Sequence, residues 1–181
     1  VVVFVAVAVG FLGGVFYSSY KSAPGKDAPP PGHSPVPNAQ SSGMSELEKE
    51  TALHPDNVAA WVQLGNLYFD ANQVDKAIGA YKRSLALVPG NADVLTDLGV
   101  MYRRKGHPRE AIEAFDRAIQ VNPRQEAAYF NKGVVFLHDL NDRENAIKAW
   151  EELLRVNPMA KVQSGELVME HDENIKKKKL P

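Results

Sequence analysis

Cysteine is absent from the sequence of 181 residues. Disulfide bonds, cysteine-ligated zinc, covalent attachment of haem and a cysteine-linked lipid anchor are therefore excluded for these residues. Because cysteine-free chains are found in reducing and oxidising compartments alike, this absence does not indicate where the protein resides.

An excess of charge of either sign is also absent. The chain has 21 lysines and arginines against 22 aspartates and glutamates, which gives a formal net charge of −1. Proteins that bind nucleic acid owe much of their affinity to basic residues that contact phosphates. The balanced composition therefore gives no reason to expect a nucleic-acid partner.

The patterns that would indicate catalysis are missing as well. The sequence shows no glycine-rich phosphate loop after a strand, no clear strand, and no serine or acidic pair in a recognisable catalytic setting. Its histidines lack the spacing of metal ligands; they are His33, His54, His107, His138 and His171. We therefore expect a protein that is not an enzyme and that holds neither a metal nor a cofactor.

A long apolar run opens the sequence. Residues 1–20 carry no charge, and Lys21 follows them. A helix of this length spans roughly 30 Å, the thickness of a bilayer core. Aromatic residues gather at its end, as in an interfacial belt. The run predicts a transmembrane anchor, and it favours an uncleaved one because bulky or charged residues precede the candidate cleavage points.

Small residues within this run suggest one further interpretation. Ala6, Gly10 and Gly14 stand four positions apart, a spacing that lets two membrane helices approach closely. A homodimer through this face is one interpretation. The alternative is that glycine and alanine are common in membrane helices generally.

Residues 21–43 differ in composition from everything around them. Half of the twelve prolines fall between Pro24 and Pro37, among glycine, serine, alanine and asparagine. Such a segment cannot bury enough apolar surface to order itself, and proline favours extended conformations. We expect a disordered linker that holds a domain away from the membrane.

A motif recurs three times in the remaining chain. Its copies end at prolines 34 and 35 residues apart and read AIGAYKRSLALVP (77–89), AIEAFDRAIQVNP (111–123) and AIKAWEELLRVNP (146–158). An earlier pattern precedes each copy with residues spaced on one helical face: Trp61, Leu64, Gly65 and Tyr68; Leu95, Leu98, Gly99 and Tyr102; Tyr129, Gly133 and Phe136. Each unit is therefore expected to be two helices, A and then B.

The residues between and within these helices have packing reasons. Gly65, Gly99 and Gly133 would let helix A lie close to helix B at Ala77, Ala111 and Ala146, while the aromatic residues Trp61, Tyr81, Phe115 and Trp150 are expected to fill the core. The A-to-B turns carry helix breakers at 72–73, 106–108 and 141–142. Each terminal proline would stop helix B.

The chain resembles the tetratricopeptide repeat (TPR) family in this period, in the Trp-x2-Leu-Gly-x2-Tyr pattern and in the later alanine, aromatic residue and proline. The resemblance implies an all-α helix-turn-helix solenoid of about three repeats at 58–91, 92–125 and 126–159. The third repeat departs from the pattern: Lys132 replaces leucine, and one extra residue falls near positions 138–142.

A cap is expected at the N-terminal end of the solenoid, whereas the C-terminal end leaves two alternatives. Residues 44–57 predict a capping helix that begins with a capping box, Ser45 and Glu48, and in which Leu47 and Leu53 fall where residues of a helix B would. Residues 160–181 predict either a polar tail or a helix that docks on the last helix B.

The TPR resemblance implies a concave groove, lined by the A helices, that binds a peptide or partner segment. The groove residues carried over from the family pattern are Val62, Asn66, Phe69, Asp97, Val100, Arg104, Phe130, Asn131, Val134 and Leu137. Val62, Ala127 and Asn131 stand where a carboxylate clamp would need basic residues, so that clamp is not expected. The apolar third repeat favours a segment with hydrophobic anchors.

The whole arrangement resembles the membrane-anchored TPR subunits of cytochrome c maturation. This implies an interaction adaptor in the bacterial inner membrane whose soluble domain faces the periplasm. Two alternatives remain open from the sequence: an assembly scaffold for a secretion, pilus or cell-envelope complex, and an organelle import receptor facing the cytosol.

Overall fold

The computed structural model describes residues 37–160. The anchor expected at 1–20, the first part of the expected linker and nearly all of the expected tail lie outside these residues. So do the small residues of the homodimer hypothesis. None of the described helices is long and apolar enough to cross a membrane.

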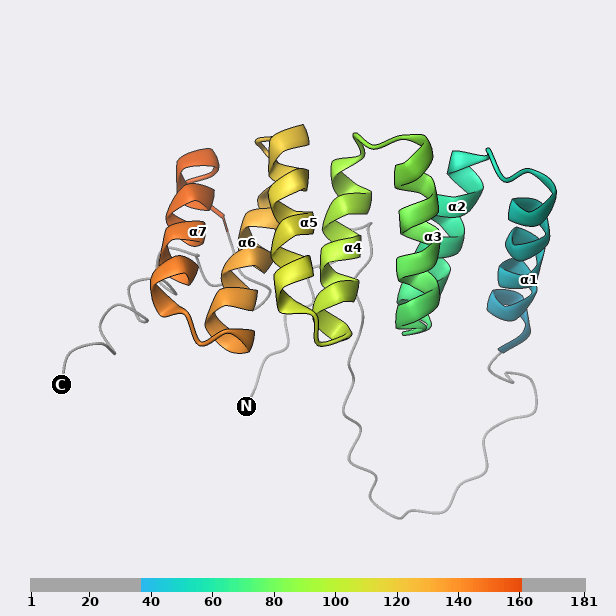
Figure 1. Cartoon of the computed structure of the whole chain (residues 1–181), viewed down its shortest axis with the longest axis horizontal. Coiled ribbons are helices and arrows are strands. Elements are labelled where there is room, and N and C mark those ends of the chain that lie inside the picture. The colour runs from blue at the N-terminus through green and yellow to red at the C-terminus, as the bar shows by residue number, and fades with distance from the viewer. Residues whose placement is uncertain (1–36, 161–181) are drawn as a thin grey trace, which may run out of the picture. The chain divides into compact units, whose positions relative to one another are not determined.

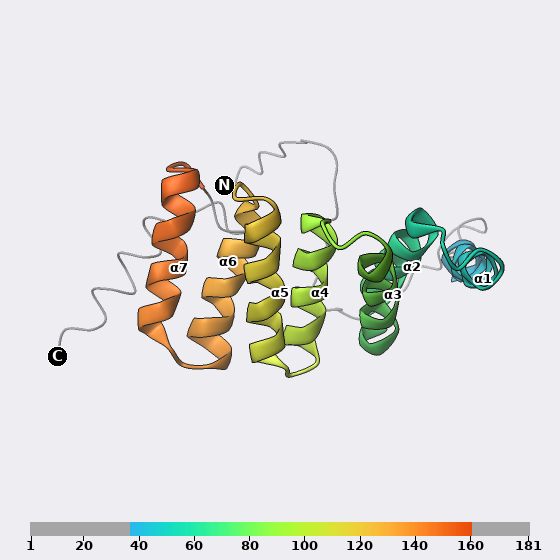
Figure 2. The same cartoon turned by 45° about the horizontal axis from the view of Figure 1, so that its top comes forward.

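The described residues form a row of helices in which each packs against its neighbours in the sequence (Figure 1). The order of the helices is also clear in the turned view (Figure 2). Their bounds are α1 Pro37–Leu53, α2 Val58–Asp70, α3 Val74–Leu87, α4 Ala92–Arg104, α5 Pro108–Val121, α6 Glu126–Val134, the π-helical turn η1 Val135–Asp139, and α7 Arg143–Val156.

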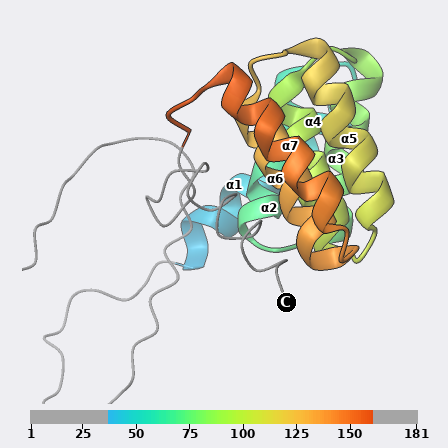
Figure 3. The same ribbon diagram turned by 90° about the vertical axis from the view of Figure 1, so that its left-hand side faces the viewer.

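The helices pair as the sequence pattern predicts. The A helices are α2, α4 and α6, and the B helices are α3, α5 and α7; each pair is in extensive contact. Viewed from the α7 end, the pairs lie one behind another along the stack (Figure 3). Because no single pair could bury its apolar face alone, stacking supplies the core.

Local chemistry explains where these helices begin and end. Asn57, Asn91 and Asp142 cap α2, α4 and α7 by accepting hydrogen bonds from backbone N–H groups. The three A-to-B turns each contain one residue with positive φ, and these are Asn72, Gly106 and Asn141. Asparagine and glycine tolerate this conformation best.

The repeated glycines do mark close approaches, but their partners differ from the expected ones. A Cβ atom at Gly65 would lie 2.5 Å from the Tyr81 ring, and one at Gly99 would lie 2.5 Å from the Phe115 ring. The same relation joins Gly133 to Trp150. Each glycine therefore makes room for the aromatic residue of its own helix B, rather than for the alanine four positions before it.

Helix α1 differs from the expected cap. It begins at Pro37, inside the segment assigned to the linker, and ends at Leu53. Ser45 therefore lies within the helix and caps nothing, while the Glu48 carboxylate accepts a hydrogen bond of 2.5 Å from the Tyr68 hydroxyl. Leu47 packs on the core, but Leu53 is 75% exposed. Glu48 therefore does not cap the helix, because the tertiary contact with α2 engages its side chain instead.

The extra residue of the third repeat is accommodated in η1. Helix α6 widens there, and the backbone N–H of Leu140 donates to the carbonyl of Val135. A π-helical turn takes in one more residue than an α-turn without breaking the helix. The insertion therefore lies slightly earlier than the positions expected from the sequence.

Three of the four aromatic residues expected in the core are fully buried: Tyr81, Phe115 and Trp150 each have 0% exposure. Trp61 is only half-buried at the margin of the core, and its indole N–H donates to the carbonyl of Pro55 at 2.9 Å. The expectation of a core Trp61 is therefore corrected, because α1 covers only part of the first A helix.

Candidate functional site

The ten residues predicted for the groove come from α2, α4, α6 and η1, and we call them the A-helix face. None of them is fully buried; each is half-buried or exposed. Their apolar members fall into two groups. Val62, Phe69 and Val100 pack at the margin of the core of the first two repeats, whereas those of the third repeat pack on a separate cluster around Trp150.

In the first two repeats, the side chains of Arg104 and Phe69 contact each other. The guanidinium of Arg104 lies 4.4 Å from the centre of the Phe69 ring, and it donates to the Phe69 carbonyl and to Asn72 Oδ1. A cation over an aromatic face stabilises both groups. Phe69 is thereby covered and offers less apolar surface than the sequence suggested.

An acidic trio lies beside this pair and consists of Asp70, Asp93 and Asp97. Burial, and after it the negative charges of Asp93 and Asp70, raise the pKa of Asp97 to about 6. The Tyr81 hydroxyl reaches the same region from helix B, where burial and the charges of Asp97 and Asp70 raise its pKa. The trio is thus a region of concentrated negative charge.

The third repeat contributes an apolar patch made of Phe130, Val134 and Leu137. All three side chains are half-buried and pack at the margin of the second core cluster. The Phe130 ring stacks on Trp150 with 6.4 Å between ring centres, and the Trp150 indole N–H donates to the Phe130 carbonyl. The buried indole therefore holds the patch in a defined position.

Two asparagines of the A-helix face each use part of their hydrogen-bonding capacity within the protein. Asn66 accepts a hydrogen bond of 2.9 Å from the Tyr81 hydroxyl through Oδ1, and Asn131 donates through Nδ2 to the Ala127 carbonyl at 2.8 Å. What stays open toward a ligand is therefore the amide donor of Asn66 and the amide acceptor of Asn131.

Polar contacts tie neighbouring repeats together around this face. Gln125 Nε2 donates to Asp93 Oδ1 at 2.9 Å, and Arg103 forms an ion pair with Asp139 in η1. Lys132, which departs from the leucine of the other repeats, forms an ion pair of 2.6 Å with Asp116 on α5. The lysine that departs from the repeat pattern thus pairs with a residue of the preceding repeat.

Sequence reasoning missed two features. The acidic trio escaped notice because its members are separated by up to 27 positions and meet only where α3, packed on both α2 and α4, brings these A helices together. A pocket of about 270 Å³ between α3, α4 and α5 was also missed, because no motif marks it. The charged lining on α5 is spaced by three and then four residues, which could have indicated a shared helical face.

Within residues 37–160 no group of three or more histidine, aspartate and glutamate side chains could hold a metal ion. His54, His107 and His138 are scattered over helix ends and turns in this part of the chain. His33 and His171 lie outside it. The A-helix face therefore has an apolar part and an acidic part.

Paired antiparallel helices with a period of 34, close glycine–aromatic contacts and stacked repeats define a TPR protein, a class of protein-interaction solenoid. Residues 46–163 match the model of the cytochrome c-type biogenesis protein H TPR domain. The chain therefore belongs to that family. A comparison with curated proteins found no match.

Similar solved structures support the same fold. One titled "Crystal structure of MamA" is 26% identical, covers 66% of this chain and 69% of that chain, and has a TM-score of 0.63. The first TPR of Spaghetti (RPAP3), bound to the HSP90 peptide SRMEEVD, is 22% identical, covers 67% of this chain and 91% of that chain, and has a TM-score of 0.58.

Proposed function

We propose that the A-helix face binds a segment of a partner protein that carries apolar anchors and a basic residue, during cytochrome c maturation. The observations that carry this proposal are an apolar patch on α6 and η1, formed by Phe130, Val134 and Leu137, and an acidic trio on the A helices of the first two repeats. An apolar side chain of the segment would cover the patch, and a cation would neutralise the trio.

The charges near the trio favour a basic partner. Arg103 and Arg104 lie on the same helix as Asp97, but Arg103 pairs with Asp139 and Arg104 rests on Phe69. Among the residues that the structure describes, neither arginine forms an ion pair with a member of the trio. A cationic side chain from outside would therefore gain an attraction that no internal group supplies.

Family membership supports the place of this interaction. The matched family is that of cytochrome c-type biogenesis protein H, and a structural neighbour holds a peptide, which supports a peptide segment as ligand here. With the apolar run at 1–20 as an anchor, the protein would be an inner-membrane adaptor that presents the A-helix face in the periplasm to haem-free cytochrome or to the haem-attachment machinery.

The test is a titration of the full chain in detergent with haem-free cytochrome c from the same cell. Phe130→Ala and Asn131→Ala should each weaken binding, by about tenfold for the loss of roughly 1.4 kcal/mol of contact. Val121→Ala is a matched control, because Val121 is an exposed apolar residue at the end of a B helix. Binding that is unchanged in both A-helix variants would refute the proposed surface.

A photoreactive residue at position 130 would test the biological role in cells. Crosslinks to apocytochrome or to a haem-attachment protein support maturation. Crosslinks confined to secretion, pilus or envelope proteins would show an assembly scaffold instead. A sided labelling experiment completes the test, because a cytosolic domain would exclude the periplasmic role and favour an import receptor.

A further inference from the structure

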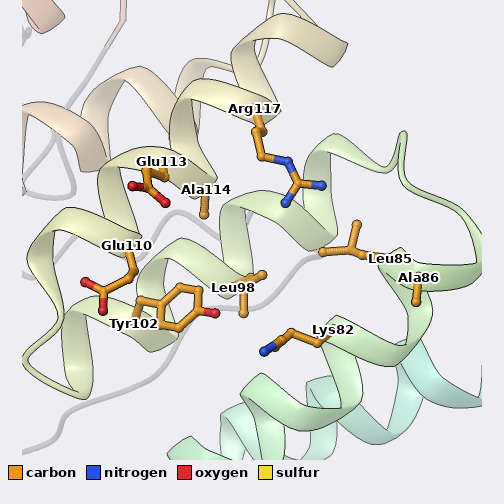
Figure 4. A pocket seen from close by; sticks show the side chains of 9 residues that line it. All are labelled: Lys82, Leu85, Ala86, Leu98, Tyr102, Glu110, Glu113, Ala114 and Arg117. Atoms are coloured by element: carbon orange, nitrogen blue, oxygen red, sulfur yellow. The ribbon is translucent and has the colours of Figure 1, made fainter.

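The pocket of about 270 Å³ between α3, α4 and α5 lies on residues that the A-helix face does not use (Figure 4). Its walls are helical stripes: Lys82 and Leu85 come from α3, Leu98 from α4, and Glu110, Glu113 and Arg117 from α5. Leu85 and Leu98 are nearly inaccessible and make an apolar floor. The pocket is therefore a helix-lined groove with charged walls.

The charges are separated along this groove. Glu110 and Glu113 lie toward one end, while Arg117 and Lys82 extend from opposite helices further along (Figure 4). Glu110 and Arg117 are seven positions apart on α5, a rise of about 10 Å or two helical turns. The groove thus has a basic part and an acidic part with apolar surface between them.

Most of these charges are not satisfied within the protein. Glu110 pairs with His107 at 2.9 Å. For Lys82, Glu113 and Arg117, no side-chain ion pair or hydrogen bond exists within residues 37–160. Such groups gain most from a partner that brings complementary charges while covering the apolar floor.

We propose that this groove docks an amphipathic helix of a partner protein, with an acidic side chain, an apolar side chain about one turn further on and a basic side chain about two turns from the acid. The acid would lie between Lys82 and Arg117, the apolar side chain over Leu98, and the base between Glu113 and Glu110, the latter two turns from Arg117. A helix fits because the charges of the groove repeat at helical spacing along α5.

The probe is an alanine-based peptide of about 15 residues, a length at which such helices begin to form in water. It carries glutamate, then leucine four positions on and lysine seven positions on from the glutamate. Fluorescence anisotropy with the full chain in detergent measures its binding. The double variant Lys82→Glu with Arg117→Glu should weaken binding at least about tenfold. Lys49→Glu with Arg124→Glu is the control, since it makes the same charge change at exposed positions elsewhere.

A second peptide, in which lysine replaces the glutamate, makes the test specific to contact. The unaltered protein should prefer the first peptide, and the double variant should prefer the second. Circular dichroism confirms that the exposed substitutions leave the helices intact. Equal effects of the double variant and its control would overturn the proposal. It would also fail if the unaltered chain is a dimer that Arg117→Glu dissociates, because a second copy would then fill the groove.

Discussion

Replacing Asp97 with asparagine should stabilise the protein at neutral pH. Burial together with the charges of Asp93 and Asp70 raises the pKa of Asp97 from 3.8 to about 6. The folded protein therefore binds this proton more tightly than the unfolded chain does. Stability is consequently lost as the pH rises from about 4 through about 6, and the loss is complete above that range.

The size of the effect can be bounded from this shift. A difference between 3.8 and about 6 corresponds to at most about 3 kcal/mol, at about 1.4 kcal/mol for each pH unit. Because the Asp97 side chain is only half-buried, solvent screens part of this penalty, and we expect about 1–2 kcal/mol. Asparagine keeps the shape of the side chain and removes the charge.

Urea unfolding at pH 7 and at pH 4 measures the effect. Asp97→Asn should raise the free energy of unfolding at pH 7 and change it little at pH 4, where the aspartate is mostly protonated in the folded state. Asp56→Asn serves as a control because Asp56 is exposed and lies in the turn before α2. Equal stabilisation at both pH values would refute the electrostatic explanation, and so would its absence at pH 7.

Two further predictions concern packing, and thermal or urea unfolding measures both. Gly99→Ala should destabilise by about 1–3 kcal/mol because the new methyl group meets the buried ring of Phe115. Gly79→Ala, with nothing within 4 Å of its new Cβ, should instead stabilise the protein by about 0.5–1 kcal/mol. If both substitutions change the free energy of unfolding in the same direction, the packing explanation is wrong. Trp150→Ala should cost about 3–5 kcal/mol, whereas Trp61→Ala should cost clearly less because Trp61 is half-buried; a reversed order would refute the corrected core.

The stability and binding predictions for Asp97 have opposite signs. A variant that removes the charge should fold more stably and should bind a basic segment less well. Proteins commonly keep such unfavourable groups where a partner needs them. If Asp97→Asn is more stable and binds the partner equally well, the trio has no role in recognition.

Much of the fold could be predicted from the sequence because its signals are local. The 3.6-residue period, the residues at the A-to-B turns and the terminal prolines each act within a few positions, and the repeats reinforce one another. The all-α solenoid follows directly. The glycine positions also indicated close helix contacts, although only the structure showed that aromatic rings of the B helices are their partners.

The sequence by itself determined that this chain builds stacked helix pairs with exposed A-helix residues. Only the tertiary structure decided that Arg104 covers Phe69, that Asp70 and Asp93 raise the pKa of Asp97, and that the extra residue widens helix α6. Arg104 and Phe69, like Asp97 and Asp70, are about 30 positions apart and meet across repeats. No local pattern specifies such contacts, because they follow from how closely one helix pair packs on the next.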